Sequence, residues 1–139
     1  MVRRLKSLMD AEGLPFGDGR NMTYNSRLAQ ETAKWGDSKP ESELLNTALY
    51  QAYFVDGQNI GDVQVLLGLV EQVGLAVDEA REVIEQRLMR PAVDADWQYA
   101  RSIGVNSVPT FAVGLTGVVG AQPYEQLAHL LEQTGASKR

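Results

Sequence analysis

Only one stretch of the sequence has the pattern of β-strands, and this shortage constrains the fold more than any other feature. Residues 110–113 alternate in polarity, residues 114–117 contain the glycines of a turn, and residues 118–120 supply a second strand. Elsewhere the hydrophobic residues recur every three or four positions, which is the spacing of helices. We therefore predict an α+β fold that is mostly α, with one antiparallel hairpin.

A hairpin of two strands is only marginally stable in water, because small stable sheets usually have three or more strands. The free N–H and C=O groups along its unpaired edges also offer a template for another chain. We therefore expect something to cover or extend this hairpin. The candidates are a second copy of the protein, a different chain, or the helices of the same chain.

Six or seven helices are predicted from the apolar spacing and from residues that start or end helices. Their ranges are 3–11, 25–35, 40–55, 63–73, 78–89, about 94–101 and 123–134. The broad apolar face of the third helix, which includes Leu44 and Leu45, predicts burial on two sides. Pro91 is expected to end the fifth helix. We predict a helical lobe over residues 1–103 and a strand–strand–helix unit over residues 104–139, together forming one compact unit.

Several residues allow a functional and a structural interpretation. Aromatic residues in the third helix, among them Tyr50 and Phe54, could line a ligand groove, but at this spacing we expect them in the core. Asp94 and Asp96 could share a divalent cation, although one of them capping a helix is the preferred interpretation. The lone His129 is expected to be a packing or surface residue. The polar cluster 17–21 is expected to be a plain turn.

Composition excludes several kinds of chemistry. The chain has no cysteine and one histidine, so it offers no thiolate nucleophile, no iron–sulfur ligands and no zinc site of the Cys/His kind. The formal net charge of −5 argues against nucleic acid as a partner. No apolar run reaches the length of a membrane span, and no export signal is visible, so we expect a cytoplasmic protein without cofactor or metal.

Two ordered motifs near the end of the chain point to a known family. They are Gly-Val-Asn-Ser-Val-Pro-Thr-Phe-Ala-Val at residues 104–113 and Val-Val-Gly-Ala-Gln-Pro-Tyr-Glu-Gln-Leu at residues 118–127. This pair resembles the strand–strand–helix terminus of DsbA-like thioredoxin-fold proteins, particularly the FrnE-type branch and the related 2-hydroxychromene-2-carboxylate isomerases. Residues 25–29, 49–54 and 57–60 resemble the helical insertion of that branch.

The resemblance implies a site around Pro109. In such proteins the matching X–Pro bond is cis and borders the active site, so we expect Asn106, Ser107, Val108, Pro109 and Thr110 to form the wall of a substrate-binding loop. The Val108 backbone would then be available to an extended peptide or to a small thiol compound. We expect the fold to be an incomplete thioredoxin-like unit.

The sequence also departs from the family. The family's domain opens with a strand, a Cys-x-x-Cys or Ser-bearing helix start and a second strand, and none of these has a counterpart here. No residue can therefore be assigned as a catalyst. A natural shortening, a missing first half and one half of a split protein remain open explanations.

Two functions follow, and a third interpretation stays open. The first is a module without redox cysteines that self-associates through the hairpin edge, as a homodimer, or binds a peptide or small thiol. The second is half of a disulfide oxidoreductase or a glutathione-linked isomerase whose catalytic half lies on another segment or chain. The third is a remnant without activity, although regular caps and apolar spacing indicate that the chain folds.

Overall fold

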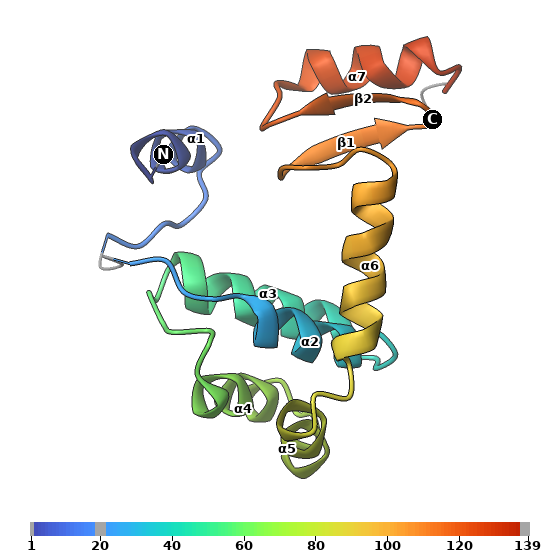
Figure 1. The fold of residues 1–139 in the computed structure, drawn as a ribbon. Helices are drawn as coiled ribbons and strands as arrows, with labels where there is room; N and C mark the ends of the chain where they lie inside the picture. Colours follow the sequence, from blue (N-terminus) through green and yellow to red (C-terminus); the bar gives the residue numbers. More distant parts are fainter. Residues whose placement is uncertain (1, 19–21, 137–139) are drawn as a thin grey trace. The chain divides into compact units, whose positions relative to one another are not determined.

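The computed structural model describes residues 2–18 and 22–136. In these ranges the chain forms seven helices and two strands (Figure 1). The helices are α1 (Val2–Ala11), α2 (Arg27–Gly36), α3 (Ser42–Phe54), α4 (Val63–Gln72), α5 (Val77–Glu85), α6 (Arg90–Ser102) and α7 (Tyr124–Gln133), and the strands are β1 (Thr110–Val113) and β2 (Thr116–Val119). The predicted α+β, mostly α, fold class is confirmed.

The chain divides into two compact units, and the division falls inside α6. The first unit runs up to Asp94 and the second begins at Ala95. The first unit therefore contains α1 to α5 with the first turn of α6, and the second contains the rest of α6, the hairpin and α7. No helix within the described ranges combines the length and the apolar character needed to cross a membrane.

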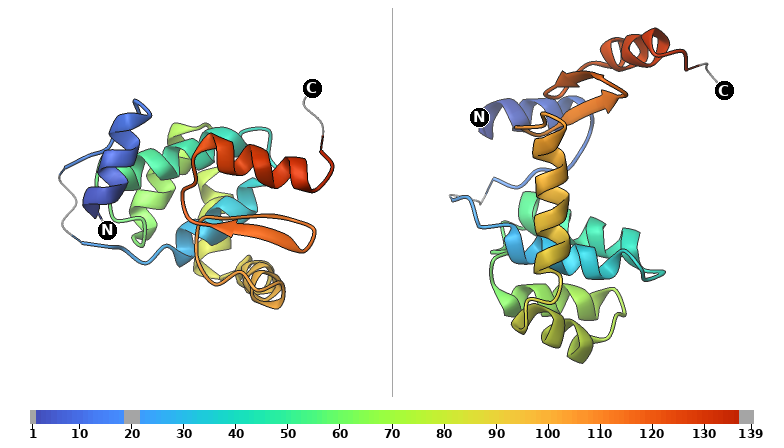
Figure 2. Two further views of the ribbon diagram at one scale, coloured as in Figure 1. Left: turned by 90° about the horizontal axis from the view of Figure 1, so that it is seen from above. Right: turned by 45° about the vertical axis from the view of Figure 1, so that its right-hand side comes forward.

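The core of the first unit is built from helices α2 to α5. Helix α4 contacts α2, α3 and α5, and the views in Figure 2 show α2 beside α3 and α4 beside α5. The side chains of Leu45, Leu66, Val70 and Ala80 are completely buried there. Helix α4 is apolar on most sides, and its position among three other helices is the physical reason.

Side-chain caps mark two helix starts that the sequence predicted. Asp62 Oδ1 accepts a hydrogen bond from the Gln64 backbone N–H at 2.7 Å, so it caps α4 as expected. At the start of α2, Asn25 Oδ1 accepts from the Arg27 N–H at 2.9 Å. Ser26 occupies the cap position there without a side-chain cap bond.

Helix α3 buries one face rather than the two that its composition suggested. Its buried residues are Leu45, Ala48, Leu49 and Ala52, which lie three or four positions apart. Leu44 is one position away from this face and is 60% exposed. The prediction of burial on two sides is therefore wrong at Leu44. Tyr50 is also exposed, at 65%, so its assignment to the core was wrong as well.

Proline 91 begins a helix instead of ending one. Helix α5 ends at Glu85, four turn residues follow, and Pro91 lies in the first turn of α6. A first-turn proline is tolerated because its missing N–H would have no partner within the helix. Asp94 and Asp96 consequently lie inside α6, so the predicted capping role of either carboxylate was wrong.

In the second unit β1 and β2 form an antiparallel hairpin, and α7 lies along it in contact with both strands (Figure 1). Thr110 faces Val119, and Val113 faces Thr116. The connection is thus the two-residue loop Gly114-Leu115, shorter than the four-residue turn expected. Gly114 has a φ of +60°, which suits glycine in a tight hairpin. The predicted turn at 17–21 falls partly on residues outside the described ranges.

Candidate functional site

The loop that resembles a substrate-binding loop connects α6 to β1 and is open to solvent. Asn106, Ser107, Val108 and Pro109 are exposed, and Val108 retains 90% of its accessible surface. Thr110 is half-buried, and its Oγ1 donates a hydrogen bond to the Ser107 carbonyl at 2.7 Å. The peptide bond between Val108 and Pro109 is cis. The five predicted residues thus form one short exposed segment leading into β1.

The register of the hairpin identifies which main-chain groups of β1 face outward. In a two-residue hairpin the pair next to the loop, here Val113 and Thr116, exchanges hydrogen bonds, and such pairs alternate with pairs that do not. The Gly120 N–H donates to the Pro109 carbonyl at 2.8 Å, in agreement with this alternation. Phe111 and Val113 therefore bond to β2. The N–H and C=O groups of Thr110 and Ala112 point to the opposite edge.

The two edges of the hairpin differ. On the outer edge of β2 the Gln122 side chain donates a hydrogen bond from Nε2 to the Val119 carbonyl at 2.6 Å, which covers an acceptor that another strand would need. Within the described residues the sheet has two strands, so the outer edge of β1 has no strand beside it. The outer edge of β1, from Thr110 to Val113, is therefore the open edge.

The chemistry available at this site is main-chain hydrogen bonding together with apolar contact. Phe111 is 40% exposed and Val119 is 58% exposed on opposite faces of the hairpin. The hydroxyl of Thr110 is already used as a donor within the loop. No side chain in residues 106–113 is acidic, basic or a thiol. The arrangement can bind an extended segment, but it offers no activated nucleophile or general base.

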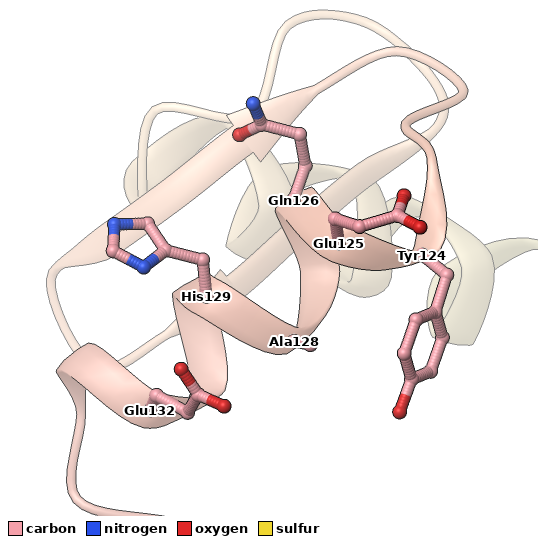
Figure 3. A pocket seen from close by; sticks show the side chains of 6 residues that line it. All are labelled: Tyr124, Glu125, Gln126, Ala128, His129 and Glu132. Atoms are coloured by element: carbon pink, nitrogen blue, oxygen red, sulfur yellow. The ribbon is translucent and has the colours of Figure 1, made fainter.

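A shallow hollow of about 460 Å³ lies on α7 and is lined in part by His129. Figure 3 shows the side chains that line it. The labelled side chains do not converge, since His129 and Tyr124 point away from each other (Figure 3). His129 is exposed, and its Nε2 lies 2.9 Å from Gln133 Nε2, so the expected surface role is confirmed. Among the described residues no group of three His, Cys, Asp or Glu side chains could hold a metal.

An apolar groove of about 520 Å³ lies in the first unit between α1 and α3. It is lined by Leu5, Met9, Leu14, Pro15, Thr47, Tyr50, Gln51, Phe54 and Val55. Tyr50 and Phe54, which the sequence assigned to the core, thus line a groove, and their rings stack at 6.2 Å between centroids. A ligand groove is the alternative interpretation that the spacing of the aromatic residues in α3 left open.

Among the residues that the structure describes, the most deeply buried charge is the carboxylate of Glu31 in α2, whose side chain is 2% exposed. Arg87 binds both of its oxygens, with Nη2 at 2.6 Å from Oε2 and Nε at 3.0 Å from Oε1. Arg27 Nε contacts Oε2 at 3.2 Å, and its Nη2 reaches Asp94 at 2.6 Å and the Arg90 carbonyl at 3.0 Å. This charged network joins α2 to the start of α6. Because the carboxylate is buried and fully paired, we assign it a structural role.

The pairing of Glu31 predicts a dependence of stability on pH. Hydrogen bonds from Arg87 lower the pKa of Glu31 below its ordinary value of 4.5; burial opposes this effect, and Arg27 adds to it. A carboxyl whose pKa is lowered by folding stabilises the protein above its unfolded pKa, and this stability is lost as the pH falls through the folded pKa. Urea titrations at a series of pH values should therefore show the free energy of unfolding falling below pH 4.5. The slope of this free energy against pH should be shallower in Glu31→Gln. An equal slope in both proteins would show that Glu31 does not cause the pH dependence.

Two residues that decide which edge of the hairpin is open cannot be recognised from the sequence. The pattern identifies Ala112 as a strand residue only, because the direction of its main-chain groups depends on the exact register. Gln122 appeared only as part of a family motif, and nothing in the sequence says that its amide covers Val119. The two-residue loop at Gly114-Leu115 was the signal that could have fixed the register.

Comparisons with known proteins identify the family and the fold. The sequence pattern of the DSBA-like thioredoxin domain matches residues 1–132. The uncharacterized protein YwbO of Bacillus subtilis (strain 168) is 35% identical over 77 residues, which cover 55% of this chain and 38% of YwbO. The match thus spans well under half of that relative.

A solved structure shares the fold. It is the crystal structure of a protein from Nitrosomonas europaea described as a "putative protein disulfide isomerase". The two structures superpose with a TM-score of 0.73 at 17% identity, over 95% of this chain and 70% of that chain. The fold is therefore shared, and the family pattern covers nearly the whole sequence. Together with the loop before β1, these findings show that this chain belongs to the family of DSBA-like thioredoxin domains, in a form without cysteine.

Proposed function

We propose that the chain is a binding module of the DsbA-like family, of the FrnE-type branch, that accepts an extended polypeptide segment along the outer edge of β1. The segment would pair with the main-chain groups of Thr110 and Ala112. It would also contact the loop formed by Asn106, Ser107, Val108 and Pro109. The open edge of β1, next to a loop in which Val108 is 90% exposed, is the observation that carries the proposal.

When a strand is added to a sheet edge, main-chain hydrogen bonds supply affinity, and alternate side chains of the added strand supply specificity. Two features of the hairpin fit this mode of binding. The other edge is blunted by Gln122, so addition is directed to β1. Phe111 and Val119 offer apolar contacts on the two faces of the hairpin. We therefore expect segments rich in β-branched and aromatic residues to bind best.

Fluorescence anisotropy with a labelled synthetic peptide, Lys-Val-Thr-Val-Thr-Val-Lys, tests the proposal. We expect saturable binding by the full chain. Ala112→Pro should weaken peptide binding about tenfold or more. Proline removes the outward N–H of residue 112 and prevents the peptide from pairing in register with β1. The ladder to β2 should survive, since Phe111 and Val113 provide its bonds.

Val119→Pro is the matched control, because it removes an N–H from the outer edge of β2. Binding by this variant should equal that of the unmodified chain. Equal loss in both variants, or binding that Ala112→Pro leaves unchanged, would contradict the proposal. Competition by reduced glutathione would reveal a small thiol bound at the same loop instead of a peptide.

A second candidate is the supporting half of a disulfide oxidoreductase or glutathione-linked isomerase. The description of the similar Nitrosomonas europaea protein favours it. The low-pKa thiolate or activated hydroxyl would then come from another segment or chain, because this chain has no cysteine. An adjacent reading frame that encodes a strand followed by Cys-x-x-Cys or an equivalent serine would support this candidate, and the absence of such a frame would count against it.

A further inference from the structure

We draw no further inference here: the strongest candidate, the apolar groove between α1 and α3 in the first unit, is lined by uncharged side chains that fit any apolar occupant, and nothing in the structure shows what covers it.

Discussion

Arg87→Ala is expected to lower the free energy of unfolding by about 3 kcal/mol, because it leaves the buried carboxylate of Glu31 with a single cation. Arg87 binds both oxygens of Glu31, whereas Arg27 contacts only Oε2 at 3.2 Å. The value lies at the low end of the usual range because Arg27 remains and the Arg87 side chain is 40% exposed. Alanine keeps the Cβ atom, so the φ of +54° at this position is equally unfavourable in both proteins.

Urea denaturation followed by circular dichroism measures this difference. Arg90→Ala is a suitable control, because Arg90 is 63% exposed and its Nε lies 3.9 Å from Asp94. An exposed pair of this kind should contribute less than about 0.5 kcal/mol. If Arg87→Ala changed stability as little as the control, the charged network would not hold α2 to the start of α6.

Leu45→Ala should destabilise the first unit by about 2–5 kcal/mol. The Leu45 side chain has no accessible surface, and it packs against Gly36 at the end of α2, so its removal leaves a cavity between α2 and α3. The loss combines the transfer of a buried leucine into water with the cost of that cavity.

The neighbouring residue provides the control for this prediction. Leu44→Ala removes the same atoms from a side chain that is 60% exposed, so the change in stability should stay within about 0.5 kcal/mol. Thermal and urea unfolding of the two variants should therefore differ clearly. Similar effects of both variants would mean that α3 buries two faces, as its composition alone suggests.

The sequence predicted the fold well wherever local chemistry decides the structure. Asp62 caps α4, Gly74 follows it with a φ of +82°, and Gly114 opens the hairpin loop, because each effect depends on a few neighbouring residues. Prediction was wrong where a choice depends on distant contacts. Leu44 and Leu45 are chemically identical, and the positions of α2 and α4, which both contact α3, decide which is buried.

Pro91 shows a different source of error. A proline between two apolar stretches can end one helix or begin another, and the sequence does not distinguish these outcomes. The structure shows that α5 ends before it at Glu85 and that Arg87 adopts a left-handed backbone. That conformation accompanies the three hydrogen bonds that Arg87 donates to Glu31, 56 residues away in the sequence. Such a partner cannot be recognised from local patterns.

The candidate site was predictable in part. Residues 106–110 were found through resemblance to the family, and the structure places them in an exposed loop before β1. The open edge itself follows from register and from Gln122, which are properties of the folded hairpin. The sequence indicated only that a two-stranded hairpin needs a neighbour.

Amide hydrogen exchange at Thr110 and Ala112 tests the central claim most directly. Both N–H groups should exchange slowly when the outer edge of β1 is paired with the synthetic peptide, and rapidly in the protein alone. The Phe111 and Val113 amides should remain protected in all conditions, because they bond to β2. Exchange at Thr110 and Ala112 that stays rapid in every condition would show that no strand is added at this edge.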